Sequence, residues 1–480
     1  MERIAVLGAG KSGLEVARWA VAHGLECVLS DVRPMTEWPH ELVHWCRDNG
    51  VRIDAGGHSM EAILSCRIIV PSPGVPLDIP VLQEARARKI PLVGELALAL
   101  SLWRGPTLGI TGTNGKTTCT ALVAEMLKNS NIDAVVGGNI GTPLLGRASE
   151  SGTRCLVAEV SSFQLDLFPS VEEWRLIGPF LHRISGYSPS YPGFDVAVLL
   201  NIAQDHLERY GEPGDYVRSK AGIFSGQPPA GWAIVEEAAL DLVTELGLEP
   251  RAKMLLIRPQ PRNSRLLITW PGGEKESYDM SRFRLMGRHN LYNLTAAIYG
   301  ARILGAGKPG IQAVIDTFRP LGHRLEFVAQ RDGIVFIDDS KATNLHATLA
   351  SVDAVDAPVV LICGGISKGQ DFDGLQDPQV RRRLRGVVFL GDVDVGLKEA
   401  LDGVPGVHIN GRGHGWEKMQ RAVRAAYAMA HPGDVVLLSP ACASFDLYSG
   451  YSERGDAFKA AVKVVISHED LPAGRQVRKD

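Results

Sequence analysis

Residues 107–118 read TLGITGTNGKTT, a short apolar run followed by a glycine-rich loop and then by the start of a helix-like pattern. Backbone N–H groups of such a strand–loop–helix unit cradle phosphates, the lysine reaches the terminal phosphate oxygens, and the hydroxyl after it can ligate Mg²⁺. The strict phosphate-loop pattern needs glycine at position 110, where this sequence has Ile110; the glycines fall at 109, 112 and 115. A glycine-rich turn without a nucleotide is the alternative, but the context favours an ATP site.

A second glycine-rich turn, Gly8-Ala9-Gly10-Lys11-Ser12-Gly13, lies near the N-terminus between a strand-like and a helix-like run. Asp31 ends the next expected strand, so the segment also fits the dinucleotide-binding pattern in which an acid binds a ribose hydroxyl. That pattern is weak evidence for one cofactor, because a helix N-terminus beneath glycines accepts any diphosphate. We expect a nucleotide-diphosphate site, with NAD(P) or simple tight packing as the alternatives.

Strand-like and helix-like runs alternate along the chain, which predicts an α/β fold with mostly parallel sheets covered by helices. The 480 residues are too many for one compact core, since single cores stop growing at about 250–300 residues. Breaks occur near Trp103-Arg104-Gly105-Pro106 and Phe318-Arg319-Pro320-Leu321-Gly322. We expect an N-terminal Rossmann-like domain over 1–104, a central P-loop ATPase-like domain over 105–320 and a C-terminal Rossmann-like domain over 321–480.

The composition is that of an ordinary globular protein, with 45% apolar and 22% charged residues and a formal net charge of −3. With no global basic field we expect no nucleic-acid partner, and anionic ligands must be bound by a few local cations. The seven cysteines include no C-x-x-C pair, which favours free thiols in a reducing compartment. No signal-peptide pattern and no run of about 18 apolar residues appears, so we expect a cytoplasmic protein without membrane insertion.

Acidic and imidazole groups follow two other expected buried strands. Glu159 ends one strand in EVSSFQ, and Asp205 and His206 follow another in NIAQDHLERYG. Because ligands gather at the carboxyl ends of parallel strands, these groups could converge beside the glycine-rich loop and serve a second divalent cation or general-base chemistry. Taken alone, Asp205 and His206 could equally be a helix-capping Asp and an incidental His.

Three further segments combine charged, hydroxyl and small residues. Gly322-His323-Arg324 lies at the expected boundary between the central and C-terminal domains, and DDSKATN at 338–344 and SPACASFD at 439–446 each follow an expected strand. The arginine could pair bidentately with phosphate, and small residues let the backbone approach a ligand. Each segment alone could be a turn or a cap. Their shared position after strands makes a site the better interpretation.

Taken together, the ordered motifs ITGTNGKTT, GGNIGTPLL, EVSSFQL, N-x-x-x-D-H, GRHNLYN, GHRLE and DDSKATN resemble the Mur ligase family, the ATP-dependent amino-acid ligases that build the peptide of bacterial peptidoglycan. The segments GGISKGQDF (364–372) and LLSPACASFD (437–446) are similar to the branch that adds D-glutamate, and the D-N-P-R-type motif of the branch that adds diaminopimelate or lysine is absent. The resemblance implies ATP-dependent ligation of D-glutamate to UDP-N-acetylmuramoyl-L-alanine through an acyl phosphate. We expect a monomer.

The resemblance also implies roles for individual residues. The implied ATP-binding residues are Gly112, Thr113, Asn114, Gly115, Lys116, Thr117, Thr118, Asn290, Asn293, Arg324 and Asp339. The implied residues for the UDP substrate are Ser12, Asp31, Arg33 and Asn139. The N-terminal turn would then hold UDP and no nicotinamide. The implied D-glutamate residues are Thr343, Lys368, Ser444, Phe445 and Tyr451, the last at a position where a relative can have Phe.

Two Mg²⁺ ions are implied, with the ligands Thr117, Glu159, His206 and Lys220. Lys220 matches the lysine that the family carries as a carbamate, an anion formed from lysine and CO₂; without the resemblance it would be interpreted as a solvated helix lysine. The implied catalytic residues are Lys116, His206, Lys220 and Lys341. His206 or a nearby carboxylate is the candidate base for the amine of D-glutamate. Domain closure would exclude water from the acyl phosphate.

The chain departs from the family pattern after EVSSFQL, where it is longer by about 20 residues. The segment Glu172–Pro192, with Trp174, Tyr187 and Tyr191, is interpreted as a surface excursion that can be trimmed, because loops tolerate added length at small entropic cost. A flap over the site or a partner contact is the alternative. Residues 471–480 are expected to form a loose tail.

Three other functions remain as alternatives. A folylpolyglutamate synthetase-like ligase would use the same kind of ATP-dependent ligation, although the LLSPACASFD segment argues against it. A nicotinamide-dependent oxidoreductase would leave the TGTNGKTT and DDSKATN motifs without a role. A P-loop switch or motor ATPase would leave the expected N-terminal and C-terminal domains without a role.

Overall fold

The computed structural model describes residues 2–139, 141–150, 154–186, 188–207, 209–409 and 413–467. The chain divides into two compact units. The first consists of Met1–Ile202, Glu212–Arg282 and Tyr292–Thr317, and the second of Ala203–Gly211, Phe283–Leu291 and Phe318–Asp480. Two short segments from the middle of the sequence therefore belong with the C-terminal part. The division into three domains, with boundaries near residues 104 and 320, stays a prediction.

The first unit contains a parallel sheet in the order β3-β2-β1-β4. Its strands are β1 (Arg3–Leu7), β2 (Glu26–Asp31), β3 (Arg52–Ala55) and β4 (Ile68–Pro71), and its helices are α1 (Lys11–Ala22), α2 (His40–Asp48), α3 (Met60–Leu64), α4 (Pro80–Ala87) and α5 (Glu95–Leu102). Ile4 and Val6 pack on the side of α1, α2 and α5, whereas Ala5 and Leu7 pack on the side of α3 and α4. Burial on both faces explains the continuous apolar strands and confirms the predicted α/β arrangement of this part.

The first unit also contains a parallel sheet in the order β10-β9-β8-β5-β7-β6. Its strands are β5 (Thr107–Thr111), β6 (Ala134–Gly138), β7 (Cys155–Glu159), β8 (Val196–Leu199), β9 (Trp232–Glu236) and β10 (Lys253–Ile257). After β5, the chain forms β6 and β7, which both lie on one side of β5 in the sheet. It then forms β8 on the opposite side of β5, followed by β9 and β10 further out on that side. The connections therefore reverse direction between β5 and β8, and ligands of open parallel sheets bind outside the carboxyl ends of strands at such a point.

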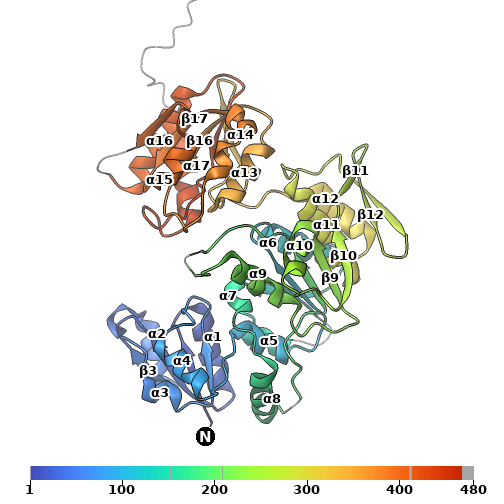
Figure 1. The fold of residues 1–480 in the computed structure, drawn as a ribbon, viewed down its shortest axis with the longest axis vertical. Coiled ribbons are helices and arrows are strands. Elements are labelled where there is room, and N and C mark those ends of the chain that lie inside the picture. Colours follow the sequence, from blue (N-terminus) through green and yellow to red (C-terminus); the bar gives the residue numbers. More distant parts are fainter. Residues whose placement is uncertain are drawn as a thin grey trace, which may run out of the picture. The chain divides into compact units, whose positions relative to one another are not determined.

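Helices and a small antiparallel sheet, β11-β12-β13, complete this part of the chain (Figure 1). The helices are α6 (Lys116–Lys128), α7 (Ser162–Leu165), α8 (Val171–Ser185), α9 (Pro213–Ala221), α10 (Glu237–Glu245), α11 (His289–Ile303) and α12 (Lys308–Thr317). The antiparallel strands are β11 (Gln260–Arg262), β12 (Arg265–Thr269) and β13 (Lys275–Asp279). Helix α11 begins in the second unit and continues into the first.

The second unit contains a sheet in the order β14-β15-β19-β16-β17-β18, parallel except for β14. Its strands are β14 (Glu326–Arg331), β15 (Ile334–Asp338), β16 (Val359–Cys363), β17 (Leu384–Leu390), β18 (Gly406–Ile409) and β19 (Val435–Leu438), and its helices are α13 (Leu345–Ala354), α14 (Pro378–Arg383), α15 (Val395–Ala400), α16 (Gly415–Met429) and α17 (Tyr451–Ser467). Val360 and Ile362 pack on the side of α16 and α17, and Val359 and Leu361 on the side of α13 and α15. This Rossmann-like layering is the predicted one (Figure 1).

Next to β4, the short apolar run Pro91–Val93 forms only an isolated bridge, between Ile69 and Leu92, instead of a strand. Proline has no N–H to donate, which weakens pairing at its position. Immediately afterwards, the Gly94 N–H bonds the carbonyl of Leu167 at 2.8 Å, so the chain leaves the sheet at this point.

Most of the expected surface excursion at Glu172–Pro192 is helical, because Val171–Ser185 forms helix α8 with one buried face; that it can be trimmed stays a prediction. Ser170 and Glu173 form a reciprocal capping box at its start, a signal that the sequence contains. Its buried side chains are Ile177, Phe180 and Leu181, which join an apolar cluster that also includes α5 and strands of both parallel sheets of the first unit. Tyr187 and residues 471–480 lie outside the described residues. Within the described part of the chain, no helix is both long enough and apolar enough to cross a membrane.

Candidate functional site

The glycine-rich loop connects the carboxyl end of β5 to the first residue of α6, at the point where the middle sheet reverses direction. Gly112 and Gly115 have φ angles of 149° and 86°, which side chains with a Cβ rarely adopt. A Cβ at Gly115 would lie 2.2 Å from Oδ1 of Asn293, so this predicted nucleotide contact packs against the loop. The strand–loop–helix context predicted from the sequence is confirmed.

Asn201, just past the end of β8, holds the loop in place. Its carbonyl accepts the Thr113 N–H at 2.8 Å, its Oδ1 accepts the Asn114 N–H at 2.9 Å, and its Nδ2 donates to the Asn114 carbonyl at 3.0 Å. These bonds attach the loop to the strand on the far side of the reversal point. The sequence analysis assigned no role to Asn201, although it is the first residue of the N-x-x-x-D-H motif.

Two lysines converge on the carbonyl oxygen of Gly112. Nζ of Lys116 donates to it at 2.7 Å, and Nζ of Lys220, from α9, donates to it at 2.9 Å. Lys220 is 1% exposed, and its ammonium lies 4.6 Å from the centre of the Tyr216 ring. The interpretation of Lys220 as a solvated lysine is therefore wrong, and its role as a carbamylated ligand of the second cation stays a prediction.

Glu159 ends β7 and pairs with Ile110 of β5, which places it next to the start of the loop. The carboxylate is 1% exposed, and its Oε1 accepts a hydrogen bond from Nδ2 of Asn139 at 2.8 Å. Its Oε2 is buried and has no hydrogen-bond partner among the described residues. An unsatisfied buried carboxylate oxygen is costly, and a divalent cation would satisfy it. This oxygen therefore fits the predicted Mg²⁺ site.

The N-terminal glycine-rich turn is also built as a phosphate-type turn, with Gly8 at a φ of 95°. Asp31 lies beneath it, with Oδ2 accepting the Ala9 N–H at 2.7 Å. Nε and Nη2 of Arg33 each donate to the carboxylate at 2.9 Å, and this pairing lowers the pKa of Asp31 to about 2. Both carboxylate oxygens of Asp31 thus accept hydrogen bonds from protein groups, and the guanidinium of Arg33 is fixed beside the turn.

In the second unit, the loops after β15, β16 and β19 meet at the carboxyl end of the sheet. Nε2 of Gln370 donates to the Ala441 carbonyl at 2.6 Å, while its Oε1 accepts the Leu345 N–H at 2.9 Å. Ile366 and Ala443 form an antiparallel bridge. The segments that carry the predicted D-glutamate residues are therefore joined to one another, and Gln370 is a second structural residue that the sequence analysis missed.

The predicted D-glutamate residue Lys368 forms an ion pair with Asp205, with Nζ 3.2 Å from Oδ1. Nδ2 of Asn344 donates to the other carboxylate oxygen at 3.0 Å. Burial alone would raise the pKa of Asp205, but Lys368, His206 and the Asn344 hydrogen bond together lower it. His206 follows with a φ of 57°. The Asp-His pair and the lysine therefore lie together within one unit.

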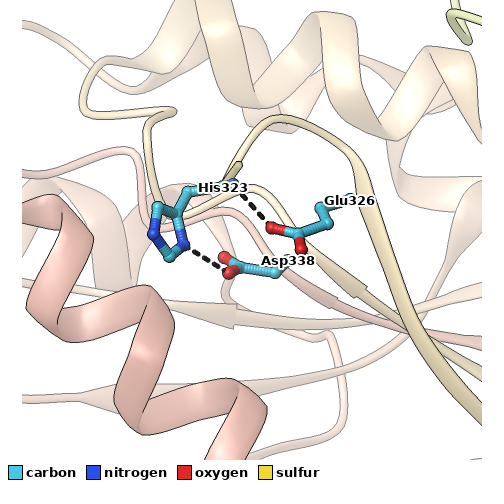
Figure 2. A group of neighbouring side chains, drawn as sticks. All are labelled: His323, Glu326 and Asp338. Atoms are coloured by element: carbon cyan, nitrogen blue, oxygen red, sulfur yellow. Dashed lines mark hydrogen bonds and ion pairs between the residues drawn. The ribbon is translucent and has the colours of Figure 1, made fainter. Parts of the chain in front are cut away.

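Hydrogen bonds of His323 stabilise the turn that contains Arg324 (Figure 2). Nδ1 of His323 lies 2.7 Å from Oδ2 of Asp338, and the His323 N–H donates to Oε2 of Glu326 at 2.8 Å. These three side chains could in principle surround a metal ion. However, the His323 ring and the Asp338 carboxylate already bond each other, and Oε2 of Glu326 accepts the backbone N–H of His323 and lies 3.3 Å from the ammonium of Lys459. We interpret the cluster as a hydrogen-bonded support for the turn.

Comparison with known proteins accounts for this combination of a phosphate loop, a diphosphate turn and a third α/β part. The sequence matches the Mur ligase MurD-like N-terminal domain over residues 2–94, the Mur ligase middle domain over 110–176 and 185–301, and the Mur ligase glutamate ligase domain over 323–442. The chain belongs to the Mur ligase family.

The relatives of this Mur ligase match it over almost the whole chain. It is 38% identical to a UDP-N-acetylmuramoylalanine--D-glutamate ligase of Desulfosudis oleivorans over 96% of each chain. It is 35% identical to a protein of the same name from Pelotomaculum thermopropionicum, over 96% of this chain and 97% of that one. The fold is similar to that of MurF from Acinetobacter baumannii, with a TM-score of 0.57 and 15% identity over 96% of this chain and 93% of that one.

The predicted site residues of this Mur ligase are distributed over both units. The first unit holds Ser12, Asp31, Arg33, Gly112, Thr113, Asn114, Gly115, Lys116, Thr117, Thr118, Asn139, Glu159, Lys220 and Asn293. The second unit holds His206, Asn290, Arg324, Asp339, Lys341, Thr343, Lys368, Ser444, Phe445 and Tyr451. Because the predicted metal ligands Glu159 and His206 fall in different units, their sharing of one site stays a prediction.

Proposed function

We propose that this Mur ligase joins D-glutamate to UDP-N-acetylmuramoyl-L-alanine at the expense of ATP, as a cytoplasmic step in building the peptidoglycan precursor. The observation that carries the proposal is the 38% identity, over 96% of each chain, to a ligase of that name. The phosphate loop on β5 and α6 supports ATP use. The oxidoreductase alternative is disfavoured, because it would leave the phosphate loop between β5 and α6 without a role.

The first step brings two anions together, because the γ-phosphoryl group of ATP must be transferred to a carboxylate, and the two groups repel each other. In our proposal, Lys116 and Arg324 supply positive charge to the phosphates, and Thr117, Glu159, His206 and a carbamate on Lys220 hold two Mg²⁺ ions. Bound Mg²⁺ would neutralise phosphate charge during transfer. The buried Oε2 of Glu159, which has no hydrogen-bond partner within the described part of the chain, supports such a site.

The acyl phosphate formed on the L-alanine carboxylate is then attacked by the amine of D-glutamate, and phosphate leaves the tetrahedral intermediate. We place D-glutamate against Thr343, Lys368, Ser444, Phe445 and Tyr451, with Lys341 near the reacting phosphates. The amine must lose a proton, and the lowered pKa of Asp205 makes this carboxylate a weak base. His206 is a candidate only while its imidazole does not ligate Mg²⁺, and a nearby carboxylate other than Asp205 is the alternative. The protein is proposed to act as a monomer on these small-molecule substrates.

Substrate dependence tests the proposal. The protein is incubated with Mg²⁺, ATP, UDP-N-acetylmuramoyl-L-alanine and single amino acids, and phosphate and product are measured. Phosphate release should require both the UDP substrate and D-glutamate. Release that ignores either one contradicts the assignment, and turnover of a folate substrate with L-glutamate would favour the folylpolyglutamate alternative.

Replacing Lys116 by Ala should abolish turnover, because the ammonium beside the phosphate loop is lost. The change is expected to lower kcat by a factor of about 10³ or more, measured as phosphate release under saturating substrates. Lys128→Ala is the matched control, since Lys128 ends the same helix with its side chain 77% exposed. Equal activity of the two variants would remove Lys116 from the mechanism.

A further inference from the structure

Hydrogen bonds at both ends fix the segment that follows β6 in the first unit. We call Asn139 and Thr142–Leu145 the β6 loop. At one end, the backbone N–H and the side-chain Nδ2 of Asn139 both bond Glu159, to its carbonyl at 2.8 Å and to Oε1 at 2.8 Å. At the other end, the N–H groups of Leu144 and Leu145 each donate to Oε1 of Glu95 at 2.6 Å.

Glu95 is unusual in its surroundings, because it is a carboxylate only 4% exposed at the start of α5, whose other residues are all buried and almost all apolar. Burying such a group is costly unless hydrogen bonds compensate it. The two short bonds to the β6 loop offset part of that cost, although burial still raises the pKa of Glu95 to about 7. The carboxylate therefore anchors the loop to α5, with no place in the proposed reaction itself.

The loop is also closely packed between these two ends. The Gly138 N–H donates to the Thr142 carbonyl at 3.2 Å, and a Cβ at Gly137 would lie 2.7 Å from the same oxygen. A displacement of Leu144 and Leu145 would therefore be transmitted toward Asn139, since little free space separates the loop from the end of β6.

As a consequence, the two carboxylate oxygens of Glu159 have different surroundings. Oε1 is held by the amide of Asn139, whereas Oε2 is buried without a hydrogen-bond partner among the described residues. One fixed oxygen sets the rotation of the carboxylate and leaves the other in a defined direction. Hydrogen-bond partners behind a metal ligand commonly orient it in this way, and their loss costs about 10–100-fold in metal affinity.

We propose that Asn139 is a positioning residue for the divalent cation, which orients Glu159 as a ligand, and that Glu95 holds the loop from which Asn139 acts. The inference rests on the proposed function, which supplies the cation. Asn139 is also predicted to contact the UDP substrate, so one side chain connects acceptor binding to cation binding.

Binding of Mn²⁺ to the protein–ADP complex tests this role, with free Mn²⁺ followed by electron paramagnetic resonance and with no UDP substrate or D-glutamate present. Asn139→Ala should weaken Mn²⁺ binding by about 10-fold or more. A residue that only contacts the UDP substrate would leave this affinity unchanged. Glu95→Gln should give a smaller loss in the same direction, because the neutral amide oxygen accepts the two N–H groups more weakly.

Glu84→Gln is the matched control, since the Glu84 side chain on α4 is 42% exposed and pairs with Arg88, the residue that follows the helix. It should bind Mn²⁺ as the wild type does. Mn²⁺ affinity within twofold of wild type in Asn139→Ala, at an unchanged melting temperature, overturns the inference. If Asn139→Ala does not fold, an unchanged affinity in the near-isosteric Glu95→Gln overturns it instead. A wild-type protein that binds no Mn²⁺ with ADP contradicts the proposed function rather than the role of Asn139.

Discussion

At the scale of single residues, Asp31 shows how a predicted ligand-binding group can also stabilise the fold. The bidentate hydrogen bonds from Arg33 lower its pKa from 3.8 to about 2. An acid whose pKa is lower in the folded state contributes stability that is complete above its unfolded pKa and is lost as the pH falls toward its folded pKa.

Asp31→Asn should therefore lower the free energy of unfolding at pH 7 by about 2 kcal/mol. The difference from wild type should shrink between about pH 4 and pH 2, as measured by urea unfolding at each pH. Asp48→Asn, at the exposed end of α2, is the control and should change little. A difference that stays constant down to pH 2 would contradict the ion-pair explanation.

Asp339 shows the opposite shift. It is 6% exposed, and burial raises its pKa from 3.8 to about 7 despite hydrogen bonds from Ser351, Ser439 and the Leu325 N–H. An acid with a raised folded pKa contributes stability that is complete below its unfolded pKa and is lost as the pH rises through its folded pKa. The ionised carboxylate thus costs stability above about pH 7.

Asp339→Asn should remove this pH dependence. Between pH 4 and pH 8, the wild type should lose about 2–4 kcal/mol of unfolding free energy relative to the variant. Asp356→Asn, on the exposed surface of the same unit, should leave the wild-type profile unchanged. Parallel profiles of Asp339→Asn and wild type would show that Asp339 is ionised at low cost.

Residue chemistry could be predicted from the sequence where a motif is contiguous, and less well where burial depends on distant segments. The strand–loop–helix setting of Lys116 follows from a single stretch of sequence. The burial of Lys220 does not, because α9 is held against α7, where Ser219 donates to the Ser162 carbonyl at 3.0 Å. Similarly, nothing local to Glu95 indicates that its carboxylate bonds Leu144 and Leu145.

At the scale of elements, the central strands were predictable because they are buried on both faces and therefore read as continuous apolar runs. Strand β3, with the sequence RIDA, lies at a sheet edge and carries no such signal. Helix α8 was missed for a different reason. Gly178 and Pro179 interrupt its helical pattern, and its apolar face is recognisable only against the cluster that it covers.

The burial of α8 predicts that this segment is not dispensable. Phe180→Ala should destabilise the first unit by about 3–5 kcal/mol, because Phe180 is 1% exposed and its removal leaves a cavity. Leu176→Ala on the same helix is the control, since Leu176 is 48% exposed and should cost about 0.5 kcal/mol or less. Chemical unfolding measures both. Equal, small effects would restore the interpretation of a trimmable excursion.

At the scale of the whole molecule, the proposed reactants are divided between the two units. The phosphate loop and the diphosphate turn belong to the first, and the segments proposed for D-glutamate belong to the second. The chain crosses between the units several times, after Ile202, Gly211, Arg282, Leu291 and Thr317. Because one chain forms both units, the proposed reaction would need no association of separate molecules to combine these groups.

We predict ligand-driven closure of the two units, since the proposed acyl phosphate must meet the amine of D-glutamate and be kept from water. Small-angle scattering should show a smaller radius of gyration with MgADP, UDP-N-acetylmuramoyl-L-alanine and D-glutamate together than without ligands. The closed complex should approach about 23 Å, the value for a compact chain of this length. D-glutamate alone contacts one unit in our proposal and should change little. A radius that stays constant at saturating concentrations of all three ligands would mean that the units already hold their reactive arrangement without substrate.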